Sequence, residues 1–181
     1  MELKYTLDET VYLEHQLFIA SKSERIKKQR VKSLVIVICA FLSLSFLFYT
    51  THNIFMMYGF GIFSMLTLFF YPYYQRQHYY KHYQKFIADN YKNRLNEPCN
   101  IVFNEDRIDC FDITGETKIN ISIIEEIIET GKYIYLKIKT GGSLIIPKLK
   151  VKNIATVQTS LALLADRLKI NYTKELEWKW K

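Results

Sequence analysis

Two long apolar segments dominate the hydrophobic pattern of the chain. Residues 34–49 and 54–71 are almost wholly apolar, and no Asp, Glu, Lys or Arg occurs between Lys32 and Arg76. As helices they would be roughly 24 and 27 Å long, and their flanking residues extend both to the roughly 30 Å of a bilayer core. Both segments are apolar on every face, whereas a helix buried in a soluble protein usually keeps a polar stripe. The pattern therefore predicts a transmembrane helical hairpin over residues 33–75.

The connection between the two segments, residues 50–53, is long enough only for a turn, so the helices must be antiparallel neighbours. A polar and charged stretch precedes the first segment and no small-residue cleavage site follows it, which argues against a signal peptide. Small residues could let the two helices approach closely, or could join copies of the chain in an oligomer. These small residues are Ala40, Ser43, Gly59, Gly61 and Ser64.

Basic residues flank the hairpin, and its turn carries none. By the positive-inside rule, this distribution predicts a multi-pass protein of the cytoplasmic membrane with both ends of the chain in the cytoplasm. Some of these basic side chains are then expected to contact lipid headgroups. The candidates for headgroup contact are Lys27, Lys28, Arg30, Lys32, Arg76 and Lys81.

Helical periodicity continues on both sides of the hairpin. Thr6 and Glu9 fit a capping box, and the pattern predicts an amphipathic basic helix within residues 1–32 that begins at Thr6. Aromatic residues at steps of three and four predict a juxtamembrane helix over residues 76–97, which Pro98 would end.

From Cys99 onwards the apolar period changes to two, which is typical of half-buried antiparallel strands. We expect about six strands, separated by turn residues such as Thr114–Gly115. Residues 123–128 fit a helical turn as well as a strand, and we assign a short turn followed by a strand from Glu126.

The last periodic segment, residues 154–168, predicts one amphipathic helix. Short antiparallel strands followed by a single helix are the order found in pleckstrin-homology-like barrels, in which the helix plugs one open end. We therefore expect an α+β membrane protein with a pleckstrin-homology-like β domain over residues 98–181. Leu161, Leu164 and Leu168 would form the plug.

Charge and cysteine content narrow the possible functions. Of the formal net charge of +7, little falls in the predicted β domain, which has thirteen basic and eleven acidic residues. A nearly neutral domain argues against nucleic-acid binding, which needs a basic face. Cys39, Cys99 and Cys110 fit no zinc spacing, so free thiols in a reducing compartment are expected.

Three groups of residues could carry chemistry. His78 and His82 lie four apart with Asp89 one heptad beyond His82, but the acidic helper of a metalloprotease motif is missing. Glu125 and Glu126 would point to opposite faces of a strand, which suits no acid–base pair. No phosphate-binding glycine loop or nucleophile elbow occurs, so we expect no enzyme, metal or cofactor. Five lysines could meet anionic headgroups, although a solvated strand face explains them better: Lys137, Lys139, Lys148, Lys150 and Lys152.

Three stretches, residues 4–30, 78–95 and 116–148, resemble the YcxB-like family of small bacterial membrane proteins. The order of basic helix, hairpin, aromatic-basic helix and strands ending in Ile145–Lys148 carries the resemblance most specifically. Ile121 and Val151 depart from the expected tryptophan and phenylalanine, and both look like core substitutions. The resemblance implies the architecture above and brings no activity or site residue with it.

Three functions are compatible with these features. The first is a non-enzymatic recognition module at the inner membrane face, which binds a protein segment or lipid headgroups. The second is self-immunity against a membrane-active peptide or toxin, which rests on analogy. The third is an enzyme that uses His78, His82 and Asp89.

Overall fold

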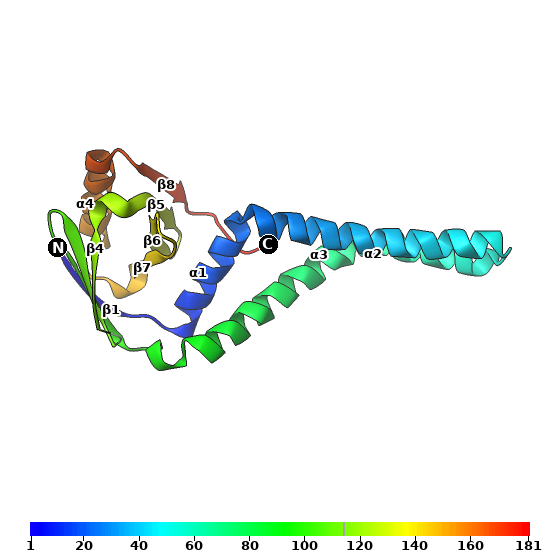
Figure 1. Cartoon of the computed structure of the whole chain (residues 1–181), viewed down its shortest axis with the longest axis horizontal. Coiled ribbons are helices and arrows are strands. Elements are labelled where there is room, and N and C mark those ends of the chain that lie inside the picture. The colour runs from blue at the N-terminus through cyan, green and yellow to red at the C-terminus, as the bar shows by residue number, and fades with distance from the viewer. Residues whose placement is uncertain (114) are drawn as a thin grey trace. The chain divides into compact units, whose positions relative to one another are not determined.

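The computed structural model describes residues 1–113 and 115–181 and has two compact units (Figure 1). The first, which we call the β-rich unit, comprises residues 1–15 and 86–179. The second, the helical unit, comprises residues 16–85 and 180–181. The fold class is α+β, as predicted, with four α-helices and two four-stranded sheets among the described residues.

The helical unit is built on the predicted hairpin. Helix α2 (Glu24–Thr50) and helix α3 (Ile54–Asn90) run side by side in opposite directions (Figure 1). His52 adopts a left-handed conformation with φ of 58° at the turn. The Asn53 side chain then caps α3 by accepting a hydrogen bond from the Met56 amide at 3.2 Å. Both helices are long and apolar enough to cross a membrane.

Side chains on one stripe of each helix join the hairpin. The Ser45 hydroxyl donates to the Met57 carbonyl at 2.7 Å, and the parallel rings of Phe48 and Phe60 have centroids 5.4 Å apart. The predicted small residues contribute only in part. Gly61 faces the Ser45 hydroxyl and Ser64 is buried, whereas Ala40 and Ser43 are exposed and a Cβ on Gly59 would meet nothing within 4 Å.

The helical segments that flank the hairpin differ from the prediction. Thr6 lies in a strand, and helix α1 (Glu9–Lys22) is capped by the Asp8 carboxylate, which accepts a hydrogen bond from the Val11 amide at 3.0 Å. The single helix expected from Thr6 to Lys32 is interrupted at Ser23, whose hydroxyl caps α2. On the other side, α3 continues through Pro72 to Asn90, and a short 3₁₀ helix, η1 (Lys92–Arg94), follows it.

The first sheet of the β-rich unit has the strand order β1-β2-β3-β4, and all its pairs are antiparallel. Strands β2, β3 and β4 follow one another along the chain, whereas β1 precedes the whole hairpin. Alternation of buried Leu3 and Tyr5 with exposed neighbours fits β1 to this sheet. The strands are β1 (Glu2–Thr6), β2 (Pro98–Phe103), β3 (Arg107–Asp112) and β4 (Gly115–Asn120).

The second sheet has the order β7-β6-β5-β8, in which β8 pairs with β5 in parallel. A 3₁₀ turn, η2 (Ile121–Ile123), leads from β4 into β5, so the assignment of a short turn followed by a strand is confirmed. The strands are β5 (Ile124–Thr130), β6 (Tyr133–Ile138), β7 (Ser143–Pro147) and β8 (Asn171–Glu175).

The predicted closed barrel is not formed. The six strands expected after Cys99 are β2 to β7, but they divide between two sheets at η2. Each sheet gains one strand that was not predicted, β1 in the first and β8 in the second. The expected turn at Thr114–Gly115 includes Thr114, which lies outside the described residues.

Helix α4 (Ile154–Leu168) has the predicted bounds and lies against the core of this unit. Its buried positions are Val157, Leu161 and Ala165, while Leu164 and Leu168 are only half-buried. A further 3₁₀ turn, η3 (Lys148–Lys150), precedes the helix. The core consists mainly of isoleucine and leucine from both sheets, including Ile101, Ile108, Ile127, Ile134, Leu136 and Ile146.

Candidate functional site

Basic side chains gather at the end of the hairpin that is remote from its turn. Here Gln75 of α3 donates hydrogen bonds to the Arg30 carbonyl at 2.8 Å and to the Ser33 hydroxyl at 2.7 Å of α2. These bonds hold the first turns of α2 beside the part of α3 that follows the apolar segment. The six predicted headgroup residues lie on these two stretches, and we call them the basic cluster: Lys27, Lys28, Arg30, Lys32, Arg76 and Lys81.

Most residues of the basic cluster have no acidic residue close to them in the sequence. Lys27 pairs with Glu24 at 2.8 Å, while Lys28, Lys32, Arg76 and Lys81 have exposed side chains. Arg30 is half-buried. The cluster therefore presents mainly uncompensated positive charge.

Trp180 packs into the same region, which the sequence analysis did not predict. Its indole N–H donates to the Arg76 carbonyl at 3.2 Å, and the Arg30 guanidinium lies over its ring, 5.4 Å from the centroid. The Tyr79 ring meets the indole edge to face at 6.4 Å. Only 8% of Trp180 is exposed. The tail residue thus bridges α2 and α3 beside the basic cluster.

The two units differ sharply in charge. The helical unit has ten Lys and Arg residues and one acidic residue, Glu24, whereas the β-rich unit has fifteen basic and seventeen acidic residues. The net positive charge of the chain therefore belongs entirely to the helical unit. Each unit combines segments that are far apart in the sequence, so the separation of charge is clearer in the structure than along the chain.

His78 and His82 lie among aromatic rings of α3. The His78 ring stacks on Tyr74 at 6.0 Å, and the His82 ring meets Tyr83 edge to face at 5.4 Å. Among the described residues, no group of three or more His, Cys, Asp or Glu side chains could hold a metal ion. Both histidines are exposed, and these ring contacts are with neighbouring residues of the same helix.

The lysines of the β-rich unit are mostly engaged with acceptors of that unit. Lys139 donates to the Ser122 carbonyl at 2.9 Å, and Lys150 pairs with Asp8 at 2.6 Å. Lys148 pairs with Glu129 at 2.6 Å, while Lys152 is exposed. These contacts leave little of this lysine group available for headgroups.

Glu125 and Glu126 do not point apart as their adjacent positions suggested. Both carboxylates contact Lys137, at 3.0 and 3.3 Å. The β5–β6 register shifts between Ile124 and Glu126, and such a bulge breaks the alternation of faces. The Glu125 hydrogen bond is the largest of the effects that raise the pKa of Lys137.

Glu129 is the centre of a buried polar network in the β-rich unit. Its carboxylate accepts hydrogen bonds from Lys148 at 2.6 Å, Gln158 at 2.7 Å and Tyr172 at 2.8 Å. Burial alone would raise the pKa of Glu129, but these hydrogen bonds outweigh it and lower the pKa. Every donor is a side chain of the same unit, so the network ties α4 and β8 to β5.

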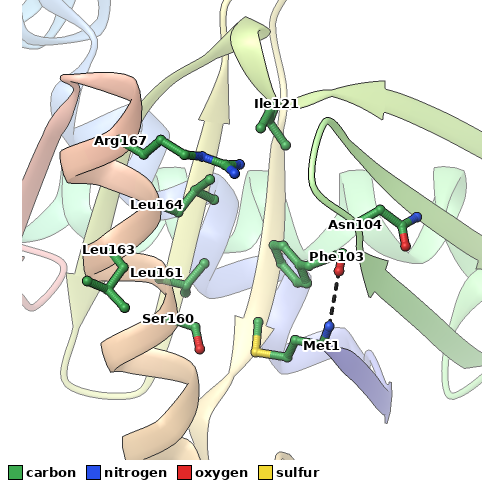
Figure 2. A pocket seen from close by; sticks show the side chains of 9 residues that line it. All are labelled: Met1, Phe103, Asn104, Ile121, Ser160, Leu161, Leu163, Leu164 and Arg167. Atoms are coloured by element: carbon green, nitrogen blue, oxygen red, sulfur yellow. Dashed lines mark hydrogen bonds between the residues drawn. The ribbon is translucent and has the colours of Figure 1, made fainter.

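A small cleft lies between α4 and the first sheet, with a volume of about 230 Å³. Figure 2 shows Leu161, Leu164 and Arg167 extending from α4 toward Phe103 and Ile121. The Arg167 guanidinium donates to the Glu105 carbonyl at 2.6 Å. The cleft explains why Leu164 is only half-buried, because the side chain packs against the core and also borders this open space.

The three cysteines are free thiols, as predicted. Cys99 and Cys110 are half-buried on neighbouring strands. Burial raises the pKa of the Cys110 thiol to about 11 and also raises that of Cys99. Both are therefore protonated and poorly nucleophilic at neutral pH.

His15 is buried in the middle of α1 with its ring 5.2 Å from that of Tyr135. Its Nε2 atom has no hydrogen-bond partner among the described residues. Burial disfavours the imidazolium and lowers the pKa of His15 to about 4. The folded protein therefore keeps this histidine neutral near pH 5, where an unfolded chain would protonate it.

Acidification should weaken the β-rich unit through His15. Since the folded pKa lies below the unfolded value of about 6.5, stability is lost as the pH falls from 6.5 towards 4. Between pH 7 and pH 5 the wild type should lose about 2 kcal/mol more than His15→Phe. Urea unfolding of both proteins at the two pH values, followed by protease sensitivity of the β-rich unit, measures the difference. If the wild type and His15→Phe lost the same unfolding free energy, His15 would take up its proton as readily in the folded protein as in the unfolded chain.

Comparison with known proteins identifies the region that contains most of the two sheets. The family model described as YcxB-like protein matches residues 103–157, from the last residue of β2 to the first turn of α4. No curated protein and no solved structure matches the chain. The resemblance drawn from the sequence is thus confirmed for this region, which is similar to the YcxB-like family.

Proposed function

We propose that this protein is an integral membrane protein that holds its β-rich unit at the cytoplasmic face as a non-enzymatic recognition module. The observation that carries the proposal is the exposed apolar surface of the hairpin. Phe55 and Phe69 are 83% and 76% exposed, and none of the most apolar window of α2 is buried. A soluble protein rarely exposes apolar surface of this extent.

The charge of the two units supports the same arrangement. Residues 33–75 lack formal charge, and the basic cluster begins directly beyond them on both helices. Positive charge at this end, and none at the turn, favours a cytoplasmic location for both ends of the chain. The lipid bilayer is then the first partner of the protein, and the basic cluster is its contact with headgroups.

The polar groups of the β-rich unit support recognition rather than catalysis. The buried carboxylate of Glu129 accepts hydrogen bonds from three side chains of the same unit, and these bonds tie α4 and β8 to β5. The carboxylates of Glu125 and Glu126 are likewise engaged with Lys137. Such groups stabilise a fold, and a module of this kind acts by binding a protein segment or lipid headgroups.

Membrane insertion and topology can be tested together. The protein should stay in the membrane fraction after carbonate extraction, because the exposed hairpin would lose its hydrocarbon environment in water. In a background with Cys39, Cys99 and Cys110 replaced by serine, a cysteine at His52 should react in intact cells with a membrane-impermeant maleimide.

The matched control is a cysteine at Lys181 in the same background, which should react only after the cells are permeabilised. Reaction at Lys181 in intact cells would reverse the proposed topology. Extraction of the protein by carbonate would contradict membrane insertion itself.

A further inference from the structure

We propose that the basic cluster selects anionic phospholipids over zwitterionic ones. The inference deepens the proposed function and rests on the insertion of the hairpin. A phospholipid phosphate in a headgroup without a compensating ammonium is the chemistry that the cluster would recognise.

The basic cluster has little acidic charge beside it within the helical unit. The only acidic residue of the helical unit, Glu24, is paired with Lys27, and Lys28, Lys32, Arg76 and Lys81 are exposed. A zwitterionic headgroup brings its own cation next to such a surface, whereas an anionic one does not. Each basic side chain near an anionic membrane surface is worth about 1 kcal/mol.

The basic cluster lies at the boundary between the apolar and the charged parts of the hairpin helices. Ser33 and Gln75, the last residues before charged ones appear on either helix, are hydrogen-bonded to each other at 2.7 Å. Lys32 immediately precedes Ser33 in the sequence, and Arg76 immediately follows Gln75. Trp180 and Tyr79 lie at the same level, and tryptophan and tyrosine are the residues enriched at the headgroup boundary. The basic cluster therefore begins where the apolar surface ends.

Contacts with Gln75, Trp180 and Lys181 fix the geometry of Arg30. Its main chain is held by Gln75, and its guanidinium is held over the Trp180 ring and donates to the Lys181 carbonyl at 3.2 Å. A guanidinium that is already ordered loses less conformational freedom when it binds a phosphate. Arg30 thus adds a preorganised cation to the exposed lysines around it.

Lipid selectivity can be measured on the full-length protein in phosphatidylcholine vesicles that contain a trace of spin-labelled lipid. The motionally restricted fraction of the spectrum should be larger for spin-labelled phosphatidylglycerol than for spin-labelled phosphatidylcholine. We expect a relative association constant of about fivefold at low salt, which falls towards one in molar salt because surface charges are screened.

The test variant combines Lys28→Gln, Lys32→Gln, Arg76→Gln and Lys81→Gln, and it should reduce the preference to less than twofold. The matched control removes four charges from exposed positions of the β-rich unit, with Lys118→Gln, Lys139→Gln, Lys152→Gln and Lys174→Gln. The control should retain the wild-type preference. A preference lost in the control and kept in the test variant would overturn the assignment of the cluster.

The outcomes separate this inference from the proposed function. If the wild type restricts both lipids equally, the protein is inserted and the lipid preference is refuted. If neither lipid is restricted, membrane insertion itself has failed. In a further arm, inorganic phosphate replaces chloride at constant ionic strength and should leave the preference unchanged. Its abolition by phosphate would mean that the cluster binds the free anion instead of the headgroup.

Discussion

Replacement of Leu161 by aspartate is expected to unfold the β-rich unit. Leu161 is 1% exposed and lies in the core between Val157 and Ala165 on the buried side of α4. A carboxylate at this position would be buried without a partner, at a cost of several kcal/mol. Since a domain of this size is stable by only about 5–15 kcal/mol, the loss is large enough to unfold most of the molecules.

The effect should be confined to the β-rich unit if the hairpin is inserted as proposed. The hairpin helices satisfy their own backbone hydrogen bonds, so the variant should remain in the membrane fraction. Limited proteolysis of membranes should then cleave it rapidly after Pro98, while the wild type resists. Leu163→Asp is the matched control because Leu163 is 65% exposed, and it should change stability by less than about 0.5 kcal/mol.

Leu164→Asp should lie between these two variants. The sequence analysis placed Leu164 in the plug, but the side chain is half-buried beside the α4 cleft, where a carboxylate can reach water. Equal protease sensitivity of the Leu161 and Leu163 variants would show that α4 is rotated about its axis relative to the described core.

The elements with strong periodicity could be predicted from sequence, and α4 is the clearest case. Its apolar residues recur at steps of three and four and one face is buried, so the predicted and observed bounds of the helix agree to the residue. The hairpin was equally clear because its two apolar segments are long and separated by a short turn. Both predictions depend only on local pattern.

Strands β1 and β8 could not be predicted because they are short and their partners are distant. The β1 strand pairs with β2, from which the whole hairpin separates it in the sequence. Its five residues also adjoin a longer helical pattern, which in the sequence includes Thr6. The β8 strand has one large side chain on its inner face, Tyr172, among polar residues. Without these two strands, six strands and a helix suggested a single barrel.

The candidate site was partly visible in the sequence. The basic residues of the cluster were identified from their positions beside the apolar segments, a local signal. The packing of Trp180 between α2 and α3 could not be identified in the same way, because it depends on contacts between segments that are far apart in the sequence. The Trp-Lys alternation at residues 178–181 was the only available hint.

The second large effect should come from breaking the pair of Glu129 and Lys148. Their side chains are 4% and 14% exposed, and their charged atoms are 2.6 Å apart. Lys148→Met leaves a buried carboxylate without its cation, which should cost about 3–5 kcal/mol. Lys137→Met is the control, because its exposed pairs with Glu125 and Glu126 are worth about 0–1 kcal/mol.

A double variant and a pH series distinguish the lost charge pair from lost packing. Glu129→Gln combined with Lys148→Met removes both charges while leaving an amide oxygen for Tyr172, so it should be more stable than Lys148→Met alone.

In the wild type the pKa of Glu129 is lowered, so its stabilisation is present at neutral pH and is lost as the pH falls through the folded pKa. In Lys148→Met, burial without the cation should raise that pKa, so protonation relieves the penalty and the gap to the wild type narrows on acidification. Denaturant midpoints of the β-rich unit at pH 7 and pH 5 measure the gap. The stability difference between the wild type and Lys148→Met could instead stay constant with pH, and the effects of Glu129→Gln and Lys148→Met could add in the double variant. That result would assign the loss at Lys148 to packing of its aliphatic chain.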